Sequence, residues 1–511
     1  MDKKETVYLL YKSSFISLTA QLVKTFSALL IRRGFLAEIG VELQGTYDVL
    51  NNILSMIQLA ELGIGTAIVY ALYVPIIEKD KQTICQLMNL YKKFYQKIGL
   101  LIIGIGLVLS FNITFFVAPD GYKKEYVQIA FMIMLFSTAS TYFLAYKREL
   151  LYADQKQYIY QLVDIAFMIL TFVGQLLSIY VLRNFYAFLI VNVVQNVGSN
   201  IVIGIICDKE YPYLSLKAVG EYKHKNQLVE NLKNIVVGKI GGFVYNSTDN
   251  LIISKMVNVS SVTFLTNYTY ITAMCKSVCS SLTAPIRPML GNYVNDETKK
   301  KENVNMIFRD YTFIMFAFLG VVVTGVFNTS DLFVTMWVGE NFHLSRMVVA
   351  LLCTDMLLGM LQTPSAELIH VLGYFRFDKY MSIAGMIINL ILSIFFVLKY
   401  GIAGVLLGTV IAQIFYFISR VSYIHKHYFQ GGLSGYLGIC VLYCMVILLD
   451  VVIVNRGMQF LTNLTVLLQF VFGVILSCII PLSILVVMFR KTQTFQDVKH
   501  KFFVKDGKVN V

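Results

Sequence analysis

Residues 98–118 read IGLLIIGIGLVLSFNITFFVA and contain no charged side chain. A run of about 20 apolar residues is long enough to cross the hydrocarbon core of a bilayer as a helix. Such runs recur along the whole 511-residue chain, whose mean hydropathy is +0.67. Only 14% of its residues are charged, whereas soluble proteins carry roughly a quarter. The sequence therefore predicts an all-α polytopic membrane protein.

Runs of this kind predict fourteen transmembrane helices. Their expected bounds are 13–33, 46–73, 98–118, 126–146, 158–182, 184–206, 233–257, 262–290, 308–329, 345–370, 380–398, 400–424, 436–454 and 462–489. With both termini in the cytoplasm, most of the 43 Lys and Arg residues fall in cytoplasmic segments. This bias is the usual determinant of membrane orientation. The basic N-terminus is not followed by a small-residue cleavage site, so we expect the first helix to be retained.

The longest polar loop divides the chain near its middle, between the sixth and seventh expected helices. We expect a six-helix bundle over 1–206, a cytoplasmic linker over 207–232 and a second six-helix bundle over 233–427. Two extra helices and a basic tail would occupy 428–511. A weak internal match at a spacing of 221 residues agrees with parallel repeats, in which an axis along the membrane normal relates the two bundles.

Composition and motifs exclude several classes of function. The net charge of +13 is explained by cytoplasmic Lys and Arg, so no nucleic-acid partner is predicted. The eight Cys lie in or beside apolar segments, with no CxxC, and the six His form no zinc-like array with them. A GxxxxGK[ST] loop is also missing. We therefore expect no metal, no cofactor and no ATP hydrolysis by this chain.

A lysine lies inside one apolar segment, Thr263–Arg287, which reads TFLTNYTYITAMCKSVCSSLTAPIR. Alternating steps of three and four residues stay on one helix face. From Thr266 they pass through Thr266, Thr269, Ala273, Lys276, Ser280, Thr283 and Arg287, all small, polar or basic. Intramembrane charges usually face a protein interior or an aqueous cavity. The alternative is a small-residue packing stripe whose lysine reaches toward the interface.

Three other expected helices carry polar faces. They contain Ser17, Gln21 and Lys24 followed by Arg32 and Arg33; Asp48, Asn52 and Ser55 followed by Glu61; and Lys239, Asn246, Asp249 and Asn250. Basic residues outnumber acids in these four helices, and a cationic cavity selects anions such as phosphate. The candidate substrate-binding residues are Lys24, Arg32, Arg33, Lys239, Lys276 and Arg287. Internal salt bridges, such as Lys24 with Asp48 or Lys239 with Asp249, are the alternative.

Three prolines interrupt two of the expected helices. Pro285 and Pro288 lie near the end of the helix that carries Lys276, and Pro364 lies inside the tenth. Proline removes a backbone donor and kinks or breaks a helix. These positions are therefore expected to be either hinges or simple kinks for packing.

The order of several short motifs resembles one family. They are ELGIGTAIVYALYVPIIEKDKQTICQLMNLYKKFYQKIG from Glu61, ELLYADQKQYI from Glu149, DKEYPYL from Asp208, STDNLIIS from Ser247, MWVG from Met336, GMIINLILS from Gly385 and GIAGVLLGT from Gly401. Together, from about Phe15 to His427, they resemble bacterial polysaccharide flippases of the Wzx type. These flippases belong to the multidrug/oligosaccharidyl-lipid/polysaccharide exporter superfamily.

The resemblance implies a function. Two six-helix bundles with two appended helices would work by alternating access in the bacterial cytoplasmic (inner) membrane. The implied substrate is an oligosaccharide on undecaprenyl pyrophosphate, moved across the membrane for capsule, exopolysaccharide or O-antigen assembly. Membrane lipids, a polymerase and chain-length machinery are the implied partners. A proton or sodium antiport would use Asp48, Glu61 or Asp249 as its ion site.

Two rival functions stay open at this point. A cation-coupled multidrug exporter of the same superfamily would need an acidic cavity. A membrane polysaccharide polymerase or glycosyltransferase would need a large outer loop with paired acids, whereas the longest outer loop, about Asn328–Arg346, holds only Asp331 and Glu340. The sequence therefore favours a transporter that is not an enzyme.

Overall fold

The computed structural model describes residues 24–58, 64–117, 122–154, 156–215, 222, 248–283, 290, 294 and 301–503. Helices dominate this part of the chain, and it contains no β-strand. The chain divides into two compact units, residues 1–263 and residues 264–511. We describe each unit by itself. The linker expected over 207–232 lies mainly outside the described residues, so that boundary stays a prediction.

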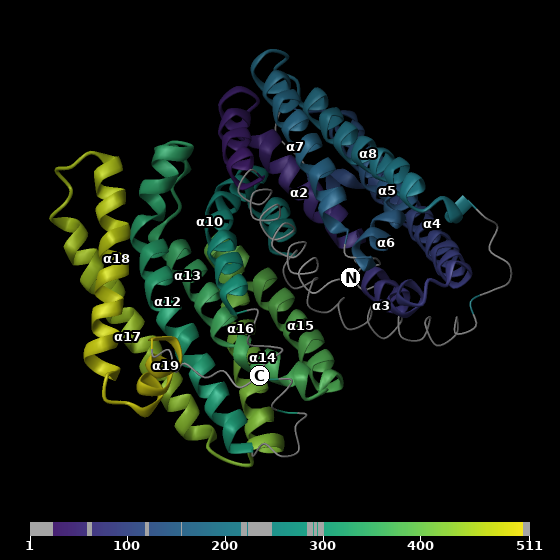
Figure 1. Cartoon of the computed structure of the whole chain (residues 1–511). Coiled ribbons are helices and arrows are strands. Elements are labelled where there is room, and N and C mark those ends of the chain that lie inside the picture. Colours follow the sequence, from purple (N-terminus) through teal and green to yellow (C-terminus); the bar gives the residue numbers. More distant parts are fainter. Residues whose placement is uncertain are drawn as a thin grey trace. The chain divides into compact units, whose positions relative to one another are not determined.

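The first unit begins with a helix over residues 24–38. It continues with α2 (Val41–Ile57), α3 (Ile64–Ile77), α4 (Lys81–Phe111), α5 (Lys124–Leu144), α6 (Arg148–Ala153), α7 (Gln157–Tyr180) and α8 (Phe185–Glu210). In Figure 1, α7 lies beside α8, and α5 packs against both α4 and α8. The core of the first unit contains fully buried aromatic side chains such as Phe35, Tyr91, Phe131 and Tyr142.

The boundary between the two units falls inside α10 (Val259–Thr283). The first five residues of α10 belong to the first unit, and the rest belong to the second unit. It continues with α12 (Lys301–Trp337), α13 (Arg346–Leu361), α14 (Thr363–Val371), α15 (Phe375–Tyr400), α16 (Ile402–Ile424), α17 (Leu433–Gln459), α18 (Val466–Phe489) and α19 (Gln493–Phe503). Both α17 and α18 pack on α12 (Figure 1). Phe316 of α12 stacks on Tyr443 of α17, with ring centroids 4.0 Å apart.

Ten helices in the described part of the chain are long and apolar enough to cross a membrane. They match ten of the fourteen expected spans: 98–118, 126–146, 158–182, 184–206 and the six from 308–329 to 462–489. The other four expected spans, 13–33, 46–73, 233–257 and 262–290, each include residues outside the description. The prediction of an all-α polytopic membrane protein is confirmed, while the count of fourteen and the repeat symmetry stay predictions.

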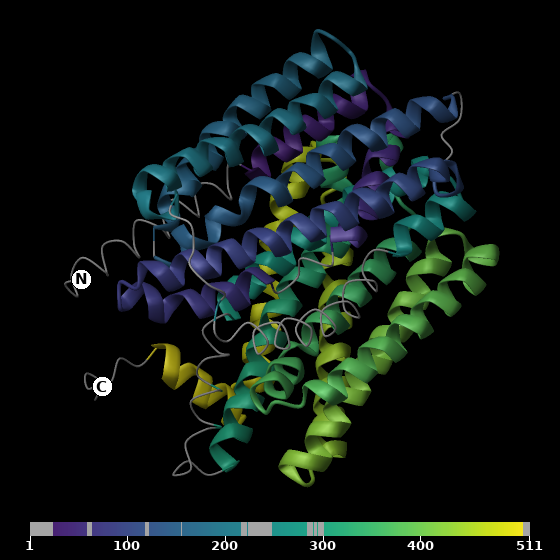
Figure 2. The ribbon, with the colours of Figure 1, turned by 90° about the vertical axis from the view of Figure 1, so that its right-hand side faces the viewer.

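Helices α15 and α16 pack closely through glycines of the motif GIAGVLLGT. Gly401 makes the turn with φ of +56°, a conformation that costs glycine little. One turn into α16, a Cβ on Gly404 would overlap the carbonyl oxygen of Phe396. A Cβ on Gly408 would likewise lie only 2.6 Å from the backbone nitrogen of Ser393. Small residues spaced by four let helix backbones approach closely in membranes, and Figure 2 shows the resulting pair of adjacent green helices.

The tenth expected span is split where Pro364 predicted a break. Helix α13 ends at Leu361, and α14 starts at Thr363 with Pro364 in its first turn. Proline is tolerated there because the first backbone N–H groups of a helix have no partner inside the helix. Gln362 therefore stands at the junction of two helical segments, with a buried side chain.

Candidate functional site

Lys276 lies on α10 and pairs with a carboxylate of α13. Its Nζ is 3.2 Å from Asp355 Oδ2, and the two side chains are 40% and 18% exposed. An ammonium group has three donors, and Asp355 takes one of them. The lysine is thus held in a fixed direction while part of its charge stays accessible.

The face of α10 that carries Lys276 is more exposed than the opposite face. Ala273 and Ser280 are exposed, and Thr266 and Thr269 are half-buried. On the opposite face, Leu265, Tyr268 and Cys279 are at most 2% exposed. The structure therefore places the polar stripe away from the core of the second unit as far as Ser280. The stripe's last members, Thr283 and Arg287, have no described side chain.

Asp355 is the first carboxylate of a hydrogen-bonded chain across the second unit. Gln413 of α16 donates from Nε2 to Asp355 Oδ1 over 3.1 Å. Gln362, at the break between α13 and α14, donates to Gln413 Oε1 over 2.6 Å. Gly359 leaves room for this contact, since a Cβ there would lie 3.3 Å from Gln413 Nε2. The chain joins Lys276 to the buried amide of Gln362.

The same chain ends at a second ion pair. Arg420 of α16 donates from Nη1 to Gln362 Oε1 over 3.0 Å and from Nε to Asp378 Oδ1 over 2.8 Å. His370 of α14 lies 3.4 Å from the other oxygen of Asp378. Side chains from α10, α13, α14, α15 and α16 and from the α13–α14 junction thus form one polar network. We call it the Lys276 network, and its members are Lys276, Asp355, Gln362, His370, Asp378, Gln413 and Arg420.

Sequence reasoning identified only Lys276 in this network. Asp355 was detectable as one of two acids, with Glu367, in the expected apolar span 345–370. Arg420 and Asp378 lie near expected helix ends, where charges are ordinary. No local signal relates them, because Gln362 and Arg420 are 58 residues apart in the chain.

A separate ionic centre lies in the first unit. Arg32, on the helix over 24–38, donates to both carboxylate oxygens of Asp48 on α2, at 3.2 and 3.0 Å. The side chains are only 5% and 7% exposed. Gln44 adds a hydrogen bond to Asp48 Oδ1 over 3.1 Å. Arg32 and Asp48 therefore neutralise each other in a buried, two-pronged pair.

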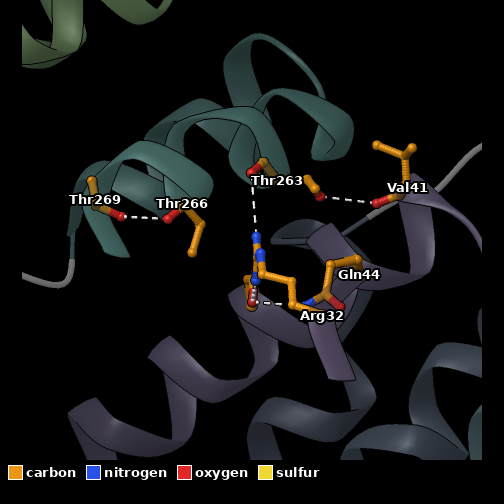
Figure 3. Close-up of polar contacts among 7 residues, drawn as sticks. Arg32, Val41, Gln44, Thr263, Thr266 and Thr269 are labelled. Carbon is orange, nitrogen blue, oxygen red and sulfur yellow. Dashed lines mark hydrogen bonds and ion pairs between the residues drawn. The ribbon is translucent and has the colours of Figure 1, made fainter. Parts of the chain in front are cut away.

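Arg32 also holds the first turn of α10. Its Nη2 donates to the carbonyl oxygen of Thr263 over 3.2 Å. The Thr263 hydroxyl in turn donates to the carbonyl oxygen of Val41, at the start of α2, over 2.9 Å. Figure 3 shows Arg32 reaching from beside Gln44 toward Thr263. Close packing supports the contact, because any Cβ on Gly45 would overlap the carbonyl of Val259.

The remaining predicted site residues are spread along the chain. Lys24 and Arg33 are exposed, and Asp249 is half-buried. Asp48 pairs with Arg32, so the alternative pairing of Lys24 with Asp48 is wrong: Lys24 lies eight residues before Arg32, more than two helical turns away. Three other predicted site residues, Glu61, Lys239 and Arg287, lie outside the residues that the structure describes.

Arg148 forms a further ionic centre that sequence reasoning missed. At the start of α6, it donates to both oxygens of Asp164 on α7, at 2.7 and 2.8 Å. It also donates to Asn200 Oδ1 on α8 over 2.8 Å. Asp164, the only acid in the expected span 158–182, was the available signal. This centre ties α6, α7 and α8 together.

Two of the quoted motifs meet at the ends of these helices. Lys156 lies 2.9 Å from Asp154 and 2.6 Å from Glu210, and Tyr211 donates to Asp154 over 2.6 Å. Burial raises the pKa of the Tyr211 phenol, and its hydrogen bond to Asp154 raises it further. Burial lowers the pKa of Lys156, but hydrogen bonds to Glu210 and Asp154 outweigh this and raise it overall. The motifs ELLYADQKQYI and DKEYPYL therefore form one contact.

In the part of the chain that the structure describes, no three His, Cys, Asp or Glu side chains are grouped so that they could hold a metal ion. The ionic centres instead pair each cation with a carboxylate, apart from the accessible portion of Lys276.

A model of a known protein family matches residues 59–347, more than half of the chain, and its description is polysaccharide biosynthesis protein. The chain belongs to this polysaccharide biosynthesis family. The match begins just before the motif from Glu61 and ends just after MWVG. It therefore confirms the family expected from the order of the motifs.

A curated relative of this family member is the probable low-salt glycan biosynthesis flippase Agl15 of Haloferax volcanii, 23% identical over 216 residues. The matched region covers 42% of this chain and 44% of the relative. The alignment thus spans less than half the length of that relative.

Solved structures share the fold of this family member. The lipid II flippase MurJ, in an inward closed conformation, superposes with a TM-score of 0.70 and 14% identity, over 93% of this chain and 98% of its own. An inward-facing multidrug resistance MATE family transporter of the MOP superfamily gives 0.64 and 13% identity, over 79% of this chain and 94% of its own. The chain therefore shares its fold with these two solved structures.

Proposed function

We propose that this chain is a flippase for undecaprenyl-pyrophosphate-linked oligosaccharide repeat units. Family membership, the partial match to a probable glycan biosynthesis flippase and the fold shared with a lipid II flippase support the proposal. In this proposal the protein lies in the bacterial cytoplasmic membrane with both termini inside. It supplies a polymerase and chain-length machinery that build capsule, exopolysaccharide or O-antigen.

The observation that carries the proposal is the accessible cation on the polar face of α10. Lys276 keeps 40% of its side-chain surface and lies among small and hydroxyl side chains. Charge-assisted hydrogen bonds to phosphate are stronger than neutral ones, and a lysine binds phosphate as a point charge. Thr, Ser and Asn hydroxyls and amides can bond sugar hydroxyls of varied composition. We assign pyrophosphate recognition to Lys276, with Lys239 and Arg287, which lie outside the described residues, as further candidates.

The other charged residues take supporting roles in this proposal. Asp355 fixes the direction of Lys276. Arg32 and Asp48, which are buried and fully engaged with each other, hold the first turn of α10 rather than contact the substrate. Asp249 and Glu61 are left as candidate ion-coupling residues.

Alternating access moves the negatively charged pyrophosphate outward, from the negative to the positive side of the membrane potential. Each elementary charge gains about 2.3 kcal/mol per 100 mV on this path. The potential alone therefore favours export, and a proton or sodium antiport would add to it.

The test measures the lipid-linked substrate separately in the two leaflets of the membrane. The gene is deleted in its host, and lipid-linked repeat units are measured in the inner and outer leaflets after complementation with wild type, Lys276→Ala or Lys276→Arg. Lys399→Ala is the matched control, because Lys399 is exposed at the end of α15 in the same unit. We expect deletion to trap the glycolipid inside, Lys276→Ala to fail, and Lys276→Arg to restore part of the export.

Two outcomes would contradict parts of the proposal. An unchanged outer-leaflet pool after deletion rejects the flippase function. Full complementation by Lys276→Ala keeps the function but rejects Lys276 as the anion site. The MATE fold also motivates a multidrug exporter as second candidate, and loss of cationic dye efflux on deletion, with normal glycolipid export, would favour it.

A further inference from the structure

Asp450 is a buried acid in the middle of α17, one of the membrane-spanning helices. Its side chain is 1% exposed, and its Oδ1 makes no hydrogen bond to any described residue. No salt bridge to it is found in the part of the chain that the structure describes. An unpaired carboxylate in such a place is costly, so its charge must be compensated.

Four other buried oxygens without a hydrogen-bond partner among the described residues lie on the helices that pack against α17. They are Thr324 Oγ1, Asn328 Oδ1 and Ser330 Oγ on α12 and Ser477 Oγ on α18. Their residues are 0%, 6%, 2% and 2% exposed. Each helix of the trio α12, α17 and α18 contacts the other two. Buried polar groups are ordinarily hydrogen-bonded, so five such oxygens on three adjoining helices need an explanation.

Packing contacts place Asp450, Thr324, Asn328 and Ser477 along about two turns of α12, whereas Ser330 lies on the face of α12 opposite Asn328. A Cβ on Gly320 would lie 3.6 Å from Asp450 Oδ2 and 3.6 Å from Pro481 on α18. Gly320, Thr324 and Asn328 are spaced by four residues and share one face of α12. Asn328 reaches the carbonyl oxygen of Val451, the neighbour of Asp450, over 3.4 Å.

Ser477, on α18, lies beside the same stretch of α12. A Cβ on Gly325 would be 3.7 Å from Ser477 Cβ. Asp450, Thr324, Asn328 and Ser477 therefore fall within about 12 Å along α12, the rise of the eight residues from Gly320 to Asn328.

Other ionisable groups on these helices lie elsewhere. Arg309 and Asp310 precede Gly320 on α12 by at least ten residues, and Asp331 is bonded to Tyr268 and paired with Arg346. On α17, Tyr436, Cys440, Tyr443 and Cys444 precede Asp450 by six residues or more, and the exposed Arg456 follows it by six. Helix α18 carries only Cys478, and α19, which packs on α12, carries Asp497, Lys499 and His500 near its own end. None of the described cations compensates Asp450.

The donor set points to one class of ligand. It consists of one carboxylate, one amide oxygen and two hydroxyls, all of them hard oxygen donors. A single negative charge matches a single positive one. Divalent cations generally take more carboxylates, and the described chain holds no cluster of three acidic or soft ligands.

We propose that Asp450, Thr324, Asn328 and Ser477 form a binding site for one monovalent cation, H⁺ or Na⁺, inside the interface of α12, α17 and α18. This site is separate from the Lys276 network and does not depend on the proposed substrate. The bound cation neutralises the Asp450 carboxylate.

The test uses the detergent-purified full chain. Binding of ²²Na⁺ is measured at equilibrium for wild type, Asp450→Asn and the control Asp497→Asn, whose acid lies outside the trio on α19. Infrared difference spectra record the band of a protonated buried carboxyl in the same three proteins. Asp450→Asn keeps the side-chain shape, and gel filtration checks that it folds.

Saturable ²²Na⁺ binding to wild type and Asp497→Asn, with loss in Asp450→Asn, identifies sodium as the ligand. Ser477→Ala should then weaken binding at least several-fold while leaving the gel-filtration profile unchanged. Absence of sodium binding, with a protonated-carboxyl band that only Asp450→Asn removes, identifies the proton. Equal sodium binding and equal spectra in wild type and Asp450→Asn overturn the proposal. If Asp450→Asn does not fold, Ser477→Ala and Thr324→Val provide the same comparison for sodium, and unchanged binding in both overturns the sodium site.

Discussion

Arg32 and Asp48 face each other from two consecutive helices, join through two hydrogen bonds and are almost completely buried. Burying the pair incurs a desolvation penalty that its Coulombic attraction only partly offsets, whereas removing one partner leaves a bare buried charge. The pair is therefore better understood as a positioning element. It fixes the first turn of α10 through Thr263, at the start of the helix that carries Lys276.

Removing one member of this pair should be far worse than removing both. Arg32→Ala or Asp48→Ala should each destabilise the protein by about 3–5 kcal/mol, because the remaining charge is buried and unpaired. The double variant Arg32→Met/Asp48→Leu should recover most of this loss. Denaturant titration in mixed micelles measures the free energy of unfolding. Additive effects of Arg32→Met and Asp48→Leu would contradict the pairing.

The ion pair of Lys276 with Asp355 can be separated from anion binding by a charge swap. Lys276→Asp/Asp355→Lys keeps a pair of opposite charges but puts the carboxylate on the polar face of α10. We expect this variant to fold like wild type, judged by thermal denaturation, and to fail in the leaflet assay. Asp355→Asn should keep part of the export, since the cation remains. Export at the wild-type level by the swapped pair would mean that Lys276 only holds the helices together.

Arg420 should not be replaceable by lysine. Its Nε and Nη1 point to different partners, Asp378 and Gln362, a fork that a single ammonium group cannot reproduce. Arg420→Lys should lower the free energy of unfolding by about 1.5–3 kcal/mol, the usual contribution of a hydrogen bond to a charged group. Arg376→Lys, at an exposed position near the start of α15, is the matched control and should change little.

The close approach of α15 and α16 predicts a contrast between two glycines. Gly408→Ala should destabilise the protein by about 1–3 kcal/mol, since the new methyl group would press on the Ser393 backbone and force the helices apart. Gly435→Ala on α17 meets nothing within 4 Å and should be neutral or stabilising by up to ~1 kcal/mol through helix propensity. Thermal denaturation of the two variants in one detergent gives the comparison.

The contact between the two motifs at Tyr211 should produce a pH dependence at the alkaline end. The pKa of Tyr211 is raised in the folded state, so folding holds a proton that the unfolded chain releases above about pH 10. The stabilisation is complete below that pH and is lost as the pH rises toward the folded-state pKa. Tyr211→Phe should flatten the decline of the melting temperature above pH 10. An identical decline in Tyr211→Phe would exclude Tyr211 as its source.

Helix positions were predictable from the sequence, but partners were not. The apolar run at 98–118 and its counterparts predicted ten of the described membrane helices because length and hydropathy determine a span locally. Lys276 was detectable as a charge inside such a run. Its pairing with Asp355 was not predictable, because helical periodicity gives the face of a residue but does not identify the helix that packs against that face. For the same reason, the sequence could not show that Asp48 pairs with Arg32, and the alternative pairing with Lys24 was wrong.

The Lys276 network has a consequence for biogenesis. Helix α10 is polar enough that it does not appear among the ten candidate spans, and the carboxylate that compensates its lysine lies 79 residues later in the chain. At a synthesis rate of about 5–20 residues per second, that partner is made roughly 4–16 s after the lysine. During this interval α10 reaches the translocon with an uncompensated charge. Its retention in the bilayer therefore depends on waiting at the insertion machinery until α13 arrives.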